Sequence, residues 1–160
     1  MLHTAWIAIL LLLAVRAGPE GPYQIILLPG PVAPAAHGEA RLHFADSPFG
    51  IAVTADGRHR YDIRVTAADL PPVASLGAEY RAYVAWEVTP DLSRWHRLGV
   101  IGNGVSTVGT AEWNKFLLVI TAEREREPAT HVGPTVLHGT SPSGWLQTFL
   151  THPLFRGISQ

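Results

Sequence analysis

The sequence predicts an all-β protein, an antiparallel β-sandwich of about eight short strands. Apolar and polar residues alternate with a period of two in several short segments, which is typical of strands with one buried and one solvent-facing side. Turn signals rich in glycine, proline and aspartate separate these segments, and no sequence repeat of fixed period is present. The 160 residues are enough for one domain with its own core.

The clearest alternation covers residues 79–88. The even positions carry Tyr80, Ala82, Val84, Trp86 and Val88, and the odd positions carry Glu79, Arg81, Tyr83, Ala85 and Glu87. We therefore expect the even side to be buried, with Trp86 at the centre of a core, and the odd side to face water.

The other strands are expected within residues 40–44, 49–53, 61–67, 94–101, 116–122 and 133–138. Phe44 and Val53 are expected to point inward on their strands. Residues 116–122 are apolar on both faces, which indicates a strand in the interior of a sheet.

A short C-terminal helix is expected after Ser143-Gly144. Trp145, Leu146, Phe149 and Leu150 share one side of such a helix, and a strand is the alternative. Residues 141–160 are accordingly assigned to a C-terminal tail.

The N-terminus reads as a secretory signal peptide. Residues 5–15 form an unbroken apolar run of eleven residues, well short of the ~20 needed to span a bilayer. Val15-Arg16-Ala17 then offers small residues at a cleavage site. Residues 1–17 are expected to be removed, which leaves no stable membrane span; an uncut anchor is the alternative. The rest divides into an edge strand and proline-rich linker at residues 18–37 and a sandwich domain at residues 38–140.

Composition excludes several classes of protein. The 12 basic and 13 acidic residues give a net charge of −1, without a basic patch, so no nucleic acid partner is expected. The chain has no cysteine, which rules out disulfides, thiol chemistry and lipid attachment through a thiol. Its only methionine is Met1, and the blue-copper ligand set is absent. No cofactor is expected.

No segment has the pattern of a catalytic site. Ser141-Pro142-Ser143-Gly144 lacks the G-x-S-x-G frame of a nucleophile elbow. The carboxylates are scattered singly, so no glycosidase-like pair can be nominated. Gly102-Asn103-Gly104 lacks a phosphate-loop frame and is expected to be a turn. We assign no catalytic residue and do not expect an enzyme.

Two exposed tryptophans with basic neighbours form the candidate partner-binding surface. Trp95 lies on a partly exposed strand near Arg97, and Trp113 lies in a loop near Lys115. Tryptophan and arginine are enriched at protein interfaces, so these four residues are the candidates for contact with a partner.

Four of the eight histidines are the candidates for a metal site: His43, His96, His131 and His138. Zinc and copper(II) accept imidazole ligands. No pair has the close spacing of a ligand motif such as H-x-x-x-H, and scattered surface histidines are the competing interpretation. We therefore assign no metal.

A series of short motifs resembles a known family. It consists of residues 38–42 (Gly-Glu-Ala-Arg-Leu), Leu70-Pro71, residues 83–86 (Tyr-Val-Ala-Trp), Leu98-Gly99, residues 120–123 (Ile-Thr-Ala-Glu) and residues 133–139 (Gly-Pro-Thr-Val-Leu-His-Gly). In this order the motifs resemble the extracytoplasmic C-terminal domain of anti-sigma-K-type factors, over about residues 38–139. The resemblance implies an immunoglobulin-like sandwich outside the cytoplasm and transfers no catalytic residue.

The sequence also departs from that family. Such factors carry a cytoplasmic sigma-binding domain before a membrane helix, whereas here four residues precede a short apolar run, so sigma-factor binding is not expected. The glycine-rich stretch of the family is replaced by Arg124-Glu125-Arg126-Glu127.

The sequence thus predicts an exported, non-catalytic binding or interaction module, periplasmic or secreted, whose partner is another extracytoplasmic protein. The alternative is an accessory domain for a metal or redox enzyme, such as a multicopper oxidase, that uses surface histidines.

Overall fold

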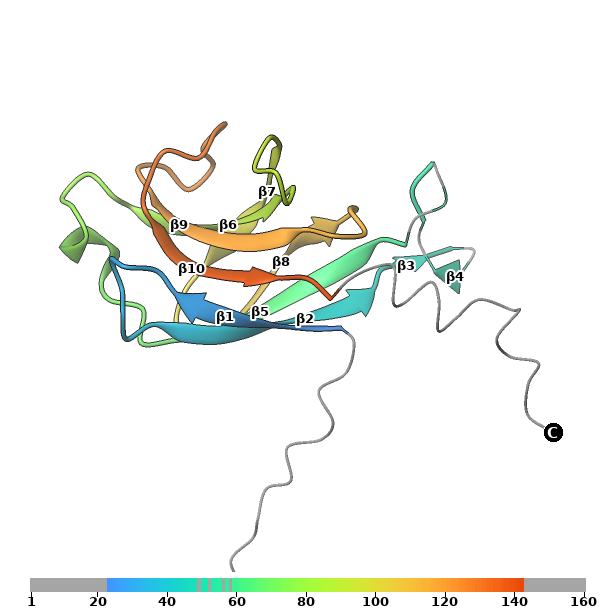
Figure 1. Cartoon of the computed structure of the whole chain (residues 1–160), viewed down its shortest axis with the longest axis horizontal. Coiled ribbons are helices and arrows are strands. Elements are labelled where there is room, and N and C mark those ends of the chain that lie inside the picture. Colours follow the sequence, from blue (N-terminus) through green and yellow to red (C-terminus); the bar gives the residue numbers. More distant parts are fainter. Residues whose placement is uncertain (1–22, 49, 52, 56, 58, 143–160) are drawn as a thin grey trace, which may run out of the picture.

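The computed structural model describes residues 23–48, 50–51, 53–55, 57 and 59–142 (Figure 1). The expected signal peptide and the expected C-terminal helix lie outside these residues. The strands are β1 (Gln24–Pro29), β2 (His37–Phe44), β3 (Asp46–Ser47), β4 (Gly50–Ile51), β5 (Tyr61–Ala68), β6 (Ala82–Val88), β7 (Trp95–Ile101), β8 (Gly104–Ala111), β9 (Leu117–Glu123) and β10 (Thr135–Thr140), with one 3-10 turn, η1 (Val73–Ser75). The predicted all-β fold class is confirmed.

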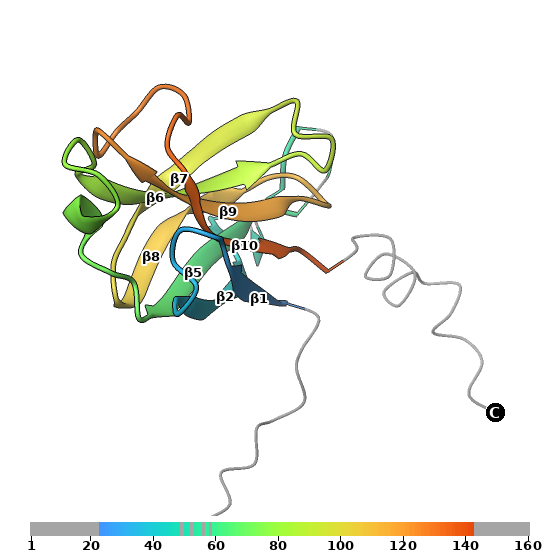
Figure 2. The ribbon, with the colours of Figure 1, turned by 60° about the vertical axis from the view of Figure 1, so that its left-hand side comes forward.

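Eight strands form one antiparallel sheet in the order β7-β6-β9-β10-β1-β2-β5-β8. The sheet folds over on itself, so that β1, β2, β5 and β8 lie against β10, β9, β6 and β7 (Figures 1 and 2). On one side the layers are joined by β1 and β10, with Leu28 opposite His138. On the other side β7 approaches β8, where a Cβ on Gly99 would lie 3.6 Å from the Cα of Val108. The result is a nearly closed sandwich.

The main core fills the space between the two layers. It contains Ile25, Leu27, Ala40, Leu42, Tyr61, Ile63, Val65, Tyr83, Ala85, Leu98, Ile101, Val108, Ala111, Phe116, Leu118, Ile120, Val136 and Leu137, among others. Strand β9 lies between β6 and β10, as predicted for the segment that is apolar on both faces. Burial of this set supplies the main driving force for folding.

A second buried cluster lies on the opposite face of β6 and β9. It contains Ala82, Val84, Trp86, Val88 and Val119, with Trp95, Val100 and Leu117 packed at its border. Trp86 is 1% exposed, so its predicted burial is confirmed. The prediction that the odd side of this strand faces water is wrong, because Tyr83, Ala85 and Glu87 lie on the main-core side and are buried too. Strand β6 has cover on both faces.

The predicted edge strand and linker at residues 18–37 also need correction. Strand β1 lies between β2 and β10, and it places Ile25 and Leu27 in the core at 1% exposure each. The proline-rich connection that follows packs as part of the fold, since Ala33 and Ala36 are 4% and 1% exposed. The sandwich therefore begins at Gln24, because β1 supplies the pairing that joins the two layers.

Two residues expected to point inward are exposed. Phe44 is 37% exposed at the end of β2, and Val53 is 52% exposed. The segment around Val53 lies outside the main sheet, where it forms the short hairpin of β3 and β4 and one isolated bridge between Val53 and His59, so it has no facing layer to pack against. No helix long and apolar enough to cross a bilayer occurs in the part of the chain that the structure describes.

Candidate binding surface

Aromatic side chains gather at the end of the sandwich where β2 and β8 end and β5 begins. Phe44 pairs with Tyr61 across β2 and β5, and Tyr61 pairs with Ala111 across β5 and β8. Tyr23 precedes β1 at the same end, where its carbonyl accepts a hydrogen bond from the N–H of Leu42. Four separate parts of the chain therefore contribute to one rim.

The rings of this rim contact one another. Tyr23 packs edge-on against Phe44 with ring centroids 5.3 Å apart, and Phe44 stacks on Tyr61 at 5.3 Å. His59 meets Phe44 edge-on at 5.1 Å. Burial raises the pKa of the Tyr61 hydroxyl above 10.0, and Tyr23 adds to the shift. Contacts of this geometry stabilise an aromatic cluster beyond the area that it buries.

A second group of side chains continues the rim on the β7 side. The guanidinium carbon of Arg94 lies 5.0 Å from the ring centroid of Trp113, a cation–π contact. The ring centroid of His96 lies 6.4 Å from that of Trp113. Arg60 joins the two groups, because its Nη2 lies 2.7 Å from Oε1 of Glu112. We define the aromatic rim as Tyr23, Phe44, His59, Tyr61, Arg94, His96 and Trp113.

A tight turn between β6 and β7 holds Arg94 in place. The N–H of Thr89 donates to the carbonyl of Arg94 at 3.0 Å, and the N–H of Arg94 donates to Oγ1 of Thr89 at 3.0 Å. Hydrogen bonds from Thr89 and Ser93 lower the pKa of Asp91 to about 2. Asp91 thus stays ionised and accepts a bond from the Ser93 hydroxyl at 2.8 Å. Arg94 therefore projects from a defined backbone.

A buried carboxylate lies beneath Trp113. Glu87 is 0% exposed, and its Oε1 accepts hydrogen bonds from the N–H groups of Glu112 at 3.1 Å and Trp113 at 2.8 Å. Its Oε2 lies 3.2 Å from Nδ1 of His96. Desolvation raises the pKa of Glu87, and this effect outweighs the hydrogen bonds from Trp113, His96 and Glu112, which lower it. Glu87 thereby ties the β8–β9 connection to β6.

Glu123 is the second buried carboxylate, at 1% exposure. Trp86 Nε1 donates to Oγ1 of Thr121 at 2.8 Å, and the Thr121 hydroxyl donates to Oε1 of Glu123 at 2.6 Å. The N–H groups of Val132 and Gly133 donate to the same carboxylate at 3.2–3.3 Å. Like Glu87, this carboxylate holds a connection in place, here the one between β9 and β10.

The four predicted partner-binding residues do not form one surface. Trp95 packs at the border of the outer cluster, whereas Trp113 packs against the main core, on the other side of the β6–β9 layer. Arg97 is exposed and pairs with Trp86 across β6 and β7. Lys115 is exposed in the β8–β9 connection. Of the four, only Trp113 belongs to the rim.

Sequence reasoning missed the rest of the rim. Arg94 and His96 flank Trp95, and strand alternation alone places them together on the side opposite Trp95. That signal was available from the sequence. The contribution of Tyr23 and Phe44 depends on long-range strand pairing, for which a local pattern carries no signal.

The candidate histidines are distributed over the molecule. His43 is exposed on β2 opposite Asp62, and His138 is exposed on β10. His131 stacks on Trp95, and His96 contacts Glu87. Among the described residues, no group of three or more His, Cys, Asp or Glu side chains lies where it could hold one metal ion.

Comparison of the chain with protein-family models, with curated proteins and with solved structures finds no match.

Proposed function

We propose that this chain is an exported binding module that recognises another extracytoplasmic protein through the aromatic rim. The observation that carries the proposal is a pair of contact groups at one end of the sandwich, Tyr23–Phe44–Tyr61 and Arg94–Trp113. The Arg60–Glu112 ion pair links the residues next to Tyr61 and Trp113 in the sequence. Tyrosine, tryptophan and arginine dominate the residues that contribute most binding energy at protein interfaces.

The exposure of the rim supports this use. Phe44 is 37% exposed, and the side chain of His96 is 50% exposed. These groups are held in place by ring contacts and by Glu87, so binding would cost little additional side-chain ordering. A pre-organised surface of this kind is what a recognition site requires.

The two buried carboxylates support a binding role over a catalytic one. Glu87 and Glu123 both accept hydrogen bonds from backbone N–H groups of nearby connections. Both carboxylates hold connections between strands through these hydrogen bonds. The rim that Glu87 supports is a contact surface.

The apolar run at residues 5–15 and the small residues before Gly18 support the proposed export. The resemblance to the extracytoplasmic domain of anti-sigma-K-type factors points to the same compartment. N-terminal sequencing of the protein recovered from periplasm or medium should begin at Gly18 or within a few residues of it; retention of residues 1–17 on membranes would contradict export by cleavage.

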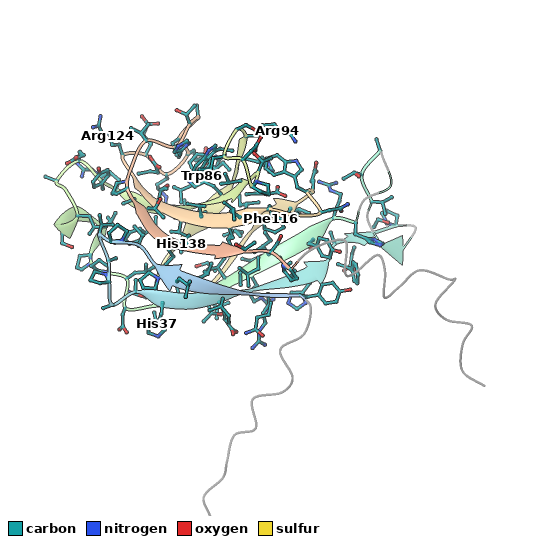
Figure 3. All side chains as sticks on the ribbon, viewed as in Figure 1. His37, Trp86, Arg94, Phe116, Arg124 and His138 are labelled. Carbon is teal, nitrogen blue, oxygen red and sulfur yellow. The ribbon has the colours of Figure 1, made fainter. Side chains whose placement is uncertain are left out.

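The rim can be tested with a matched pair of charge reversals. Arg94 and Arg124 are both exposed, and they lie beyond opposite ends of β6 and β9 (Figure 3). Each variant, Arg94→Glu and Arg124→Glu, is immobilised and used to capture proteins from periplasm or culture medium. We expect a partner that binds the wild type and Arg124→Glu, and whose affinity falls by tenfold or more with Arg94→Glu, about 1.4 kcal/mol.

Thermal melts of the three proteins must agree, so that the loss reports the surface and not the fold. Equal capture by all three proteins would place the contact elsewhere and remove the rim from the proposal.

A further inference from the structure

An apolar groove crosses the outer face of the layer formed by β1, β2 and β5. It has a volume of about 450 Å³ and is lined by Ile26, Leu27, Leu28, Pro29, His37, Gly38, Glu39, Thr66, Ala67 and Ala68. Ile26 and Leu28 are 49% and 55% exposed, although both are large and apolar. Two such side chains on one strand form a patch that commonly marks an interaction site.

Small residues make the groove. Gly38 lies on β2 between Leu27 of β1 and Ala67 of β5. A Cβ on Gly38 would lie 2.5 Å from the carbonyl oxygen of Thr66, so no side chain is tolerated there. Gly38 shares the core-facing side of the sheet with Leu27 and Ala67, so these three residues present backbone to the groove. On the outer face Ile26 lies opposite Glu39 of β2, and Leu28 and Ala68 also line the groove.

The chain leaves the sandwich beside this groove. Strand β10 runs antiparallel to β1 with Leu28 opposite His138, which brings Thr140 beside Ile26. Ser141 is fixed there, since its N–H donates to the carbonyl of Phe116 at 2.9 Å and its Oγ accepts from the N–H of Phe116 at 2.8 Å. By the same register Ser141 lies beside Ile25 and Pro142 beside Gln24, so the described chain ends two residues beyond the Ile26 end of the groove.

The sequence after Pro142 has the composition of an occupant. Residues 143–150 carry no charge and include Trp145, Leu146, Phe149 and Leu150. These four apolar residues are spaced to share one side of a helix. At ~3.3 Å per extended residue, three residues span about 10 Å, enough to cross the ~4.8 Å between neighbouring strands.

We propose that the groove is the docking site for the chain's own residues 145–150, with Trp145 and Leu146 over Ile26 and Leu28. Docking removes the largest apolar side chains of the segment and of the groove from water at the same time. In this arrangement residues 145–150 cover the outer face of β1. The proposal does not depend on the aromatic rim or on the proposed partner.

The absence of cysteine from the chain makes a cross-linking test clean. Leu28→Cys is combined with Leu146→Cys, and a control protein combines Val132→Cys with Leu146→Cys. Val132 is 69% exposed in the β9–β10 connection, on the outside of the other layer. Both proteins are oxidised mildly at low concentration and analysed by non-reducing gel and mass spectrometry.

We expect an intrachain disulfide in the Leu28/Leu146 pair at several times the yield of the Val132/Leu146 control. Addition of Trp145→Asp should reduce that yield, because a charge is disfavoured in an apolar groove. Equal yields in the two pairs, or none in either, would overturn the proposal. Disulfide-linked dimers from the Leu28/Leu146 pair would overturn it too, in favour of a second copy as the occupant.

A second measurement does not depend on disulfide geometry. Hydrogen exchange at the amides of Ile26 and Leu28 should be several times faster in the Trp145→Asp, Phe149→Asp double variant than in the wild type. Unchanged exchange at β1 would contradict docking. Exchange at β9, on the other layer, serves as the control for global stability.

Discussion

His131 lies flat against Trp95, with ring centroids 3.5 Å apart and ring planes 13° from parallel. Both rings meet Trp86 nearly edge-on at 6.2 Å and 75°. Trp86 is therefore closed in by β7 from one side and by the β9–β10 connection from the other. This contact gives β6 its second buried face.

Trp86→Ala should lower the free energy of unfolding by about 3–5 kcal/mol, because it removes a fully buried aromatic ring and leaves a cavity. The variant also takes away the indole donor to Thr121. Denaturant unfolding followed by circular dichroism measures the change. Trp86→Phe keeps an aromatic ring but loses the indole donor, so its free energy of unfolding should lie between those of wild type and Trp86→Ala. A melting temperature of Trp86→Ala within a degree or two of wild type would contradict the burial of Trp86.

Gly133→Ala should destabilise the protein by about 1–3 kcal/mol or more through overpacking. A Cβ on Gly133 would lie 1.6 Å from the backbone oxygen of Ala122, which cannot move without disturbing β9. Gly102→Ala is the control, since nothing lies within 4 Å of a Cβ there. Thermal melts of both should separate them clearly; equal stability of the two variants would argue against the close approach of the β9–β10 connection.

Glu87→Gln should make the protein less sensitive to pH. Burial raises the pKa of Glu87, so the folded chain holds this proton more tightly than the unfolded chain does. The stability contributed by the group is complete below pH 4.5 and is lost as the pH rises through the raised folded-state pKa. Glutamine stays neutral, and its oxygen can still accept from the N–H groups of Glu112 and Trp113.

The expected result is that Glu87→Gln gains stability relative to wild type as the pH rises above 4.5, by about 1.4 kcal/mol for each unit of pKa shift. Glu87→Ala is the contrast, because it leaves the part-buried N–H groups of Glu112 and Trp113 without their acceptor, at a cost of about 1–3 kcal/mol each. Urea titrations at several pH values give these differences. A Gln variant that tracks wild type at every pH would mean that the charged carboxylate is fully compensated by His96.

Zinc and copper(II) should bind weakly, without defined stoichiometry. His43, His96 and His131 contact different parts of the fold, and a tight site needs several neutral imidazoles around one ion. Isothermal titration calorimetry at pH 7.5 tests this. One site of sub-micromolar affinity, abolished by a single His→Ala change, would favour the metal-accessory function instead.

Period-two alternation was enough to find most strands, including β5 and β6, and to identify β9 as an interior strand. It could not find which side of β6 faces the main core. Alternation distinguishes the two faces of a strand, but both faces are buried when the sheet folds over and a connection covers its outer side. Glu87 is an example. A carboxylate on a strand is predicted to face solvent, and its burial can be predicted only when the N–H groups that donate to it are known.

The packing of the proline-rich residues 29–36 differs from the predicted linker for a related reason. Proline favours an extended backbone, and that preference says nothing about burial. Here Gly30 donates to the carbonyl of Val136 at 2.7 Å, and Ala33 and Ala36 pack into the core. The rim shows the same limit, because Phe44 and Trp113 reach it from strands and connections far apart in the sequence.

The pairing of β1 with β10 sets the order in which this fold can be completed. The first and the last strand of the described sandwich are neighbours, and Leu28 and Pro29 can find His138 and Leu137 only after almost the whole domain has been synthesised. Contacts between distant parts of a chain slow folding. A ribosome-bound chain that lacks Thr135–Thr140 would leave one edge of each layer open, so the two layers can be joined only after β10 has been made.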